Sequence, residues 1–238
     1  MQTISDIRTH FLTELKNKNF TEDRLGDKTI EMIGASFLAD EPAIFGEPNK
    51  EYIDREIDWY MRMSTNITDI YGKDERQPPM AWQYAADRFG NINSNYGKLI
   101  FDEKFYNQYD MVLQELEANP DTRRACMVYN RPSIWTEYNE DGKDDFICTN
   151  AVTYYLREAW TRHHTGDIQR IDCVVQMRSN DVIFGYRNDW AWQQHILKEL
   201  CEDLGEFTAP GKMIWQVQNL HVYEKHFDLV SLHNEYLQ

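Results

Sequence analysis

The pattern of hydrophobic and polar positions divides the chain into helix-like and strand-like segments. Apolar residues recur with helical spacing over residues 4–15 and 52–63, and in the second segment Ile53, Ile57 and Tyr60 share one face. Further helices are predicted over residues 81–89, 190–204 and 226–237, and over a stripe formed by Tyr106, Tyr109, Leu113 and Leu116.

Runs of apolar and β-branched residues predict strands between these helices. The runs cover residues 29–38, 125–129, 151–156, 171–177 and 213–223. Helices and strands are interspersed without strict β-α-β alternation, and the composition does not break along the chain. This order favours a single domain of the α+β class covering residues 1–238.

Composition sets limits on the class of protein. With 42% apolar residues among 238, the chain has enough material for a large core, which argues against disorder. It contains no apolar run long enough to span a bilayer and no N-terminal signal pattern, so we expect a cytoplasmic protein without membrane partners. The four cysteines are scattered without C-x-x-C spacing, so we expect neither disulfides nor zinc.

The net charge narrows the class of ligand. A formal charge of −15 repels nucleic-acid polymers and anionic membranes. A few clustered arginines can still bind a single phosphate. The contrast favours a nucleotide monomer as the partner.

The candidate chemistry begins at one cysteine. Cys148 ends a polar loop and opens an apolar run, whereas Cys126, Cys173 and Cys201 are interpreted as small buried hydrophobic residues. A thiolate is the strongest protein nucleophile near neutral pH, and a nearby arginine lowers the pKa of the thiol. Cys148 together with fixed cations and a downstream carboxylate suits attack on an anionic substrate.

The cations and the carboxylate lie in a motif that resembles a known signature. Arg178-Ser179-Asn180-Asp181, followed by Gly185 and then Asp189, resembles the thymidylate synthase family pattern Arg-Ser-x-Asp, Gly, Asn, with Asp in place of the final Asn. Other segments agree in the family's order and extend the resemblance over nearly the whole chain: residues 29–37, 55–60, 93–97, 121–124 and 221–223. Within the family, the chain is similar to the bacteriophage deoxycytidylate hydroxymethylase branch.

This resemblance implies a fold and a reaction. The implied fold is a large mixed β-sheet with helices packed on one face, in a homodimer formed sheet against sheet. The implied reaction converts dCMP, methylenetetrahydrofolate as co-substrate, and water to 5-hydroxymethyl-dCMP and tetrahydrofolate without a metal. It also implies the cytoplasm of an infected bacterial host as the location, and other phage nucleotide-synthesis enzymes as partners.

The resemblance also assigns roles to two catalytic side chains. Cys148 is the nucleophile that adds to ring carbon six of the pyrimidine, and Glu56 orders water and relays protons. Taken alone, the cysteine would be interpreted as a structural residue and the glutamate as a surface residue of a helix. If Glu56 is buried, desolvation raises its pKa, as proton relay requires.

Substrate-binding roles follow in the same way. Arg178, Ser179 and Arg24 match phosphate-binding residues, and Arg123-Arg124 match a pair that reaches the phosphate of the neighbouring subunit. The converging arginines would also favour the Cys148 thiolate, so Arg178 is predicted to be catalytic as well as phosphate-binding. From the residues alone, these are ordinary solvated arginines. His221 and Tyr223 match residues that contact the ribose. Tyr96, Trp82 and Asp181 match positions near the folate and the pyrimidine.

Asp189 is expected to identify the base. Cytosine presents an unprotonated ring nitrogen and an exocyclic amine, and a carboxylate accepts a hydrogen bond from that amine. With a shared proton, it also stabilises protonated cytosine for attack by the thiolate. The alternative is an N-cap for a helix beginning at Trp190.

Some features depart from the usual family pattern and leave alternatives open. Thr149 and Arg187 stand where thymidylate synthases usually carry His and Pro, and both match the phage hydroxymethylases. The chain ends twelve residues after His226, so we expect a site that is less covered and admits water. The alternatives are a dCMP 5-methyltransferase or a dUMP enzyme like thymidylate synthase, and a non-catalytic nucleotide- or RNA-binding relative. The presence of Cys148, Glu56 and the arginines argues against loss of catalysis, and the acidic charge argues against RNA.

Overall fold

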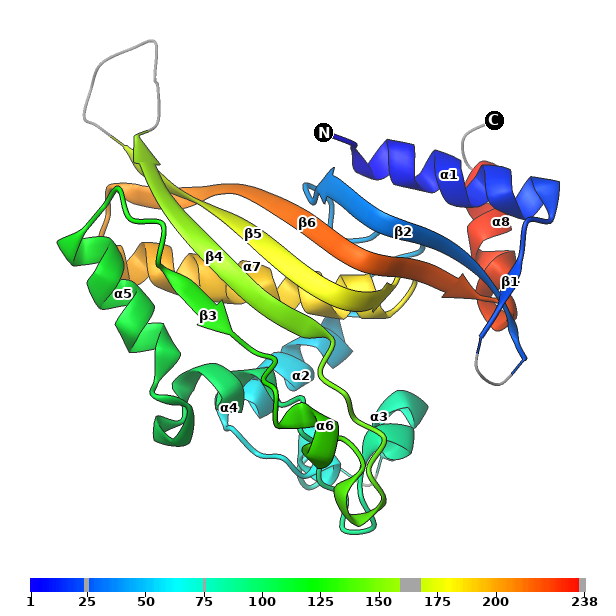
Figure 1. The fold of residues 1–238 in the computed structure, drawn as a ribbon, viewed down its shortest axis with the longest axis horizontal. Coiled ribbons are helices and arrows are strands. Elements are labelled where there is room, and N and C mark those ends of the chain that lie inside the picture. Colours follow the sequence, from blue (N-terminus) through cyan, green and yellow to red (C-terminus); the bar gives the residue numbers. More distant parts are fainter. Residues whose placement is uncertain (24–25, 75, 159–167, 236–238) are drawn as a thin grey trace. The chain divides into compact units, whose positions relative to one another are not determined.

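The computed structural model describes residues 1–23, 26–74, 76–158 and 168–235 (Figure 1). The helices are α1 (Ile4–Asn17), α2 (Lys50–Met61), α3 (Met80–Ala85), α4 (Tyr96–Phe101), α5 (Gln108–Ala118), α6 (Ile134–Glu137), α7 (Gly185–Leu204) and α8 (Phe227–Glu235). The strands are β1 (Thr21–Glu22), β2 (Lys28–Leu38), β3 (Cys126–Val128), β4 (Thr149–Glu158), β5 (Gln169–Asp181) and β6 (Thr208–Tyr223). In the described part of the chain, no helix is both long and apolar enough to cross a membrane.

The strands form a mixed sheet, as expected. Within the described residues its order is β1-β2-β6-β5-β4-β3. The pairing of β2 with β6 is antiparallel, whereas β5 and β6 run parallel. The prediction of an α+β fold with a large mixed sheet is therefore confirmed. The helices and strands group into two compact units.

The first unit comprises residues 1–48 and 157–238. In it, α7 packs against β5 and β6, and α1 packs against β2. In the core between α7 and the sheet, the ring of Tyr186 contacts the rings of Phe37 and Trp215, with centroids 5.9 and 5.4 Å apart. This packing fixes the first turn of α7 against β2 and β6.

The second unit comprises residues 49–156. The rings of Tyr60 and Tyr96 join α2 to α4, with centroids 5.4 Å apart. The close approach of these helices depends on Gly97, because a Cβ atom there would lie 1.9 Å from the carbonyl oxygen of Tyr60. The Asn93–Gly97 segment noted in the sequence therefore contains a position where a larger side chain does not fit.

Two predicted boundaries near the signature motif were wrong. Strand β5 continues to Asp181, so Arg178 and Ser179 lie within the strand rather than after it. The polar residues at the end of β5 stay in the extended conformation because β6 continues to pair with them, with Asp181 opposite His221. Helix α7 begins at Gly185 rather than Trp190, which places Asp189 inside the helix.

The predicted stripe that begins at Tyr106 was also partly wrong. Helix α5 begins only at Gln108. Tyr106 precedes it in the left-handed conformation, with φ of 68°, and its side chain is 82% exposed. The residues that α5 buries are Tyr109, Val112 and Leu116.

Candidate active site

Glu56 is buried in the second unit, as a proton-relay role requires. Its side chain is 4% exposed and lies on α2. The hydroxyl of Tyr52 donates to Oε1 of Glu56 at 2.5 Å, and Nε1 of Trp82 donates to the same oxygen at 3.0 Å. Burial raises the pKa of Glu56 to about 7, while the hydrogen bonds from Tyr52 and Trp82 act in the opposite direction. The carboxyl can therefore exchange a proton near neutral pH.

The helix that carries Glu56 starts earlier than the apolar pattern predicted. Asn49 caps its first turn by accepting a hydrogen bond from the backbone N–H of Tyr52 at 3.1 Å. The cap sets where α2 begins. Glu56 and Tyr52 lie one turn apart and face the same side.

Cys148 lies immediately before β4, as the change from polar to apolar residues predicted. Its side chain is half-buried, and its Sγ lies 3.8 Å from the carbonyl oxygen of Phe146. The next residue, Thr149, begins β4 and is fully buried. The strand thus fixes the backbone on one side of the thiol.

Asp145 anchors the loop on the other side of the thiol. Its carboxylate accepts hydrogen bonds from the backbone N–H groups of Asn93 and Ser94 and from the hydroxyl of Ser94, at 2.5 to 2.8 Å. Burial raises the pKa of Asp145, and the Ser94 and Asn93 donors oppose that rise. Sequence reasoning missed this role, because the partners of Asp145 lie about fifty positions earlier in the chain.

Asp189 in the first unit is held by a chain of hydrogen bonds. Nδ2 of Asn180 donates to Oδ2 of Asp189 at 2.7 Å. Oδ1 of Asn180 accepts from Nε1 of Trp215 at 3.2 Å, and because an indole only donates, this contact fixes which way the amide points. Trp215 is fully buried, so the orientation of Asp189 is set from the core.

The N-cap alternative for Asp189 was wrong. The N-cap position of α7 is Phe184, and Asp189 is in the second turn of the helix. Asp181 fills the capping role instead, since its carboxylate accepts from the backbone N–H groups of Ile183, Phe184 and Gly185. Asp181 therefore fixes the turn between β5 and α7. Its predicted position near the folate and the pyrimidine stays a prediction.

Glycine at position 185 allows the residues of the signature motif to pack closely together. A Cβ atom at this position would lie 3.1 Å from Nδ2 of Asn180 and 3.9 Å from Oδ2 of Asp189. A side chain there would crowd the hydrogen bond that orients Asp189. This is a physical reason for the glycine that follows Arg-Ser-x-Asp in the motif.

The predicted ribose contacts lie at the end of β6. His221 is 8% exposed, and the rings of His221 and Tyr223 contact edge to face, with centroids 4.9 Å apart. Burial lowers the pKa of His221, and the Asp181 carboxylate opposes this effect. A neutral imidazole has one donor and one acceptor nitrogen, which suits a sugar hydroxyl.

The predicted phosphate residues occupy separate elements. Arg178 is half-buried in β5, next to Ser179, whereas Arg123 is exposed in the loop before β3. Arg124 is 78% exposed in its side chain and forms an ion pair with Glu115 at 3.1 Å. Arg24 lies outside the described residues.

Within the second unit, the structure brings Trp82 to Glu56, while Tyr96 is buried against Tyr60 and Tyr129.

Arg187, noted in the sequence only as a departure from the family, has a structural role. Its side chain is 8% exposed, donates to the carbonyl oxygen of Glu47 and stacks on the ring of Phe184. Burial lowers the pKa of this guanidinium. Only a long side chain can reach the carbonyl oxygen of Glu47, and the proline that the family usually carries at this position cannot.

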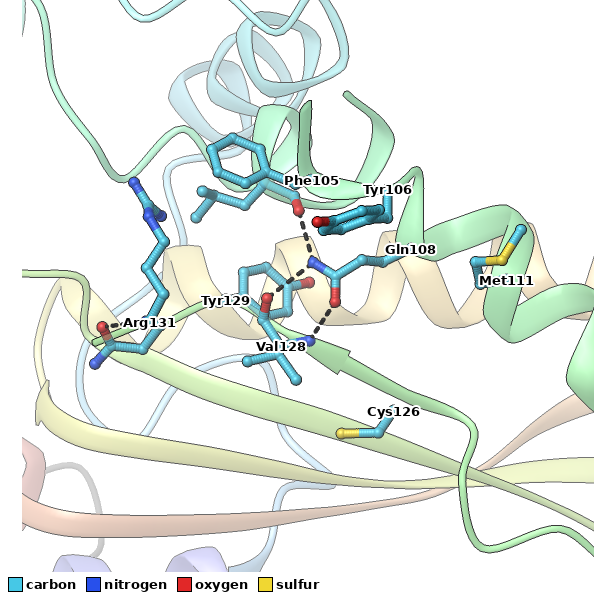
Figure 2. A pocket seen from close by; sticks show the side chains of 10 residues that line it. Phe105, Tyr106, Gln108, Met111, Cys126, Val128, Tyr129 and Arg131 are labelled. Atoms are coloured by element: carbon cyan, nitrogen blue, oxygen red, sulfur yellow. Dashed lines mark hydrogen bonds between the residues drawn. The ribbon is translucent and has the colours of Figure 1, made fainter. Parts of the chain in front are cut away.

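A groove of about 400 Å³ in the second unit contains none of the predicted site residues. Figure 2 shows Gln108 at its centre, with the side chain amide bonded to the backbone N–H and carbonyl of Val128 at 2.7 and 2.8 Å. Gln108 thus occupies the backbone hydrogen-bonding groups of Val128 in β3, an edge strand of the sheet. Cys126 lines the groove and is only half-buried, so the prediction of a buried residue was wrong there, whereas Cys173 and Cys201 are buried.

Among the described residues, no group of three or more His, Cys, Asp or Glu side chains is placed to hold a metal ion. Chemistry without a metal stays a prediction.

Comparisons with known proteins agree with the motif. The family model for thymidylate synthase matches residues 14–235. The chain is 50% identical over 234 residues to the deoxycytidylate 5-hydroxymethyltransferases of Enterobacteria phages T4 and T2, and the match covers 96% of this chain and 89% of each relative. It is 24% identical over 230 residues to the thymidylate synthase of Buchnera aphidicola subsp. Schizaphis graminum (strain Sg), covering 91% of this chain and 78% of that relative.

Proposed function

We propose that this chain, which belongs to the thymidylate synthase family, is a deoxycytidylate 5-hydroxymethyltransferase that acts in the cytoplasm of an infected bacterial host. The observation that carries the proposal is the 50% identity, over 96% of the chain, to phage enzymes of that name. Enzymes of the family use methylenetetrahydrofolate, which serves here as the one-carbon donor.

The geometry of Asp189 supports cytosine as the base. Its carboxylate already accepts the Asn180 amide, and a carboxylate has about four lone-pair positions, so it can also accept from an exocyclic amine. The amide of Asn180 cannot turn to offer its oxygen instead without losing the bond from Trp215. The site is thus built around an acceptor that faces a donor on the substrate.

The reaction starts with the thiolate of Cys148, which adds to ring carbon six of dCMP and makes ring carbon five nucleophilic. Carbon five then attacks the one-carbon unit of the folate. Loss of the ring proton and departure of tetrahydrofolate leave an exocyclic methylene. Water adds to that methylene, and its proton passes to Glu56. Re-formation of the ring double bond expels the thiolate, which balances dCMP, methylenetetrahydrofolate and water against 5-hydroxymethyl-dCMP and tetrahydrofolate.

The first prediction concerns the product. Incubation of the enzyme with dCMP and methylenetetrahydrofolate should add one CH₂O group to the nucleotide, with the new oxygen taken from isotopically labelled water. Mass analysis of the nucleotide and the folate checks this outcome. A gain of one CH₂ group, with release of dihydrofolate, would instead identify a methyltransferase and overturn the proposal.

The active form is a homodimer in which sheets pack face to face and the arginine pair of one subunit serves the other. One feature of the surface supports this arrangement. Arg123 and Arg124 lie in an exposed loop, where they can reach a neighbouring molecule.

Mixing two inactive variants tests the shared site. We expect Cys148→Ser and Arg123→Ala/Arg124→Ala proteins to regain about one quarter of the wild-type activity after subunit exchange, because half of the dimers are mixed and each has one intact site. Steady-state turnover measures the recovery. Mixing Cys148→Ser with a protein carrying all three substitutions is the control and should restore nothing. A fully active monomer in light scattering at assay concentration would contradict the shared site.

A further inference from the structure

One oxygen of Glu56 is enclosed by two neutral donors. Tyr52 lies one turn before Glu56 on α2, and its hydroxyl donates to Oε1 at 2.5 Å. Nε1 of Trp82, on α3, is placed to donate both to Oε1 at 3.0 Å and to the Tyr52 hydroxyl oxygen at 2.9 Å. The three side chains form a closed set of hydrogen bonds around a single carboxylate oxygen.

The other oxygen of Glu56 is left for a different partner. Within the part of the chain that the structure describes, no hydrogen bond reaches Oε2. This atom is also not among the unpartnered polar atoms that are sealed from solvent. Oε2 therefore retains a small accessible surface in a side chain that is otherwise buried.

We propose that Tyr52 is a positioning residue for the reaction: together with Trp82 it occupies Oε1 of Glu56 and so makes Oε2 the oxygen that exchanges a proton with the attacking water. Two donors on Oε1 leave Oε2 as the oxygen that bears the proton in the neutral carboxyl and as the open acceptor in the carboxylate. Burial raises the pKa of Tyr52 above its ordinary value, so its hydroxyl stays a donor. The inference rests on the proposed function, in which water adds to an exocyclic methylene.

Charged groups on the neighbouring elements do not replace these donors. The pKa of Glu56 responds to burial first and then to Tyr52 and Trp82. The charged side chains on α2 and the following segment pair with one another, with Glu51 contacting both Arg55 and Arg76, and Arg76 contacting Asp74. On the other elements packed against α2, Asp69 accepts from Ser64 and Lys98 pairs with Asp102.

The test is a carbon-13 NMR titration of the Glu56 carboxyl in the ligand-free protein, assigned with Glu56→Gln. In the wild type it should titrate near pH 7. Tyr52→Phe removes a donor to the carboxylate, so the midpoint should move upward by about one unit. Tyr71→Phe is the matched control, because it removes a phenol hydroxyl beside the same helix without a bond to Glu56, and its midpoint should match the wild type.

Activity gives a second readout that a purely structural role would not move. Since the carboxylate is the active form, the acid limb of the kcat profile should shift to higher pH in Tyr52→Phe by the same interval. Trp82→Phe removes the second donor and should move the titration in the same direction.

Two outcomes separate the inference from the proposed function. A Glu56 midpoint that is the same in wild type, Tyr52→Phe and Trp82→Phe overturns the positioning role. Because the titration needs no substrate, the expected midpoints together with no hydroxymethylated product would support the positioning of the carboxyl and overturn the proposed activity.

Discussion

Cys148→Ser is expected to lower turnover of dCMP by about 10⁴-fold or more, because in the proposed mechanism it removes the covalent nucleophile, and with it the whole reaction path rather than one contact. A serine hydroxyl is far less ionised than a thiol near neutral pH, and it cannot add to ring carbon six at a useful rate. The variant should also fail to form a covalent complex with 5-fluoro-dCMP and methylenetetrahydrofolate. Single-turnover kinetics and mass analysis of the intact protein measure the two effects.

Cys126→Ser provides the matched control. Cys126 is also half-buried and undergoes the same atom exchange, but it lines the groove beside Gln108. This variant should keep near-normal turnover and still be trapped by the fluorinated nucleotide. Near-normal activity in Cys148→Ser would remove the covalent mechanism.

The sequence predicted those parts of the site that depend on neighbouring residues. The change from a polar loop to an apolar run placed Cys148 directly before a strand, where the structure has it. Helical spacing placed Glu56 on a helix. The motif identified Asp189, because its distance from Asp181 is fixed by the short turn between β5 and α7. The catalytic roles of these residues remain predictions.

The sequence did not predict the groups that orient them, because those groups are distant along the chain. Trp215 fixes the amide of Asn180 from 35 positions away, and Trp82 reaches Glu56 from 26 positions away. The end of β5 was misjudged for the same reason. Its polar residues 179–181 lie in a strand that pairs with residues 219–221 of β6. Local propensity cannot report such long-range partners.

Asp189→Asn is expected to reverse the choice between cytosine and uracil. In the proposed site, the wild-type carboxylate accepts from the exocyclic amine of dCMP, whereas dUMP would present a carbonyl oxygen to it and leave two acceptors opposed. Mispaired buried polar groups discriminate by roughly four orders of magnitude in well-built sites. The asparagine would supply a donor to uracil and remove the acid that shares a proton with cytosine. The ratio of kcat/KM for dCMP and dUMP, in wild type and variant, measures the change.

Asp203→Asn separates base recognition from the loss of a charge. Asp203 is exposed near the end of the same helix, so this variant changes the charge of α7 by the same amount without touching Asn180. Its nucleotide preference should equal that of the wild type.

The substitution at Asp189 leaves Asn180 held by Trp215, which keeps an amide donor facing the new side chain. The new asparagine would therefore turn its own oxygen to Asn180 and its NH₂ group to the base, the orientation that suits uracil. A wild type that prefers dUMP, or a ratio unmoved by Asp189→Asn, would show that Asp189 does not read the base, and the assignment of dCMP as substrate would fall with it.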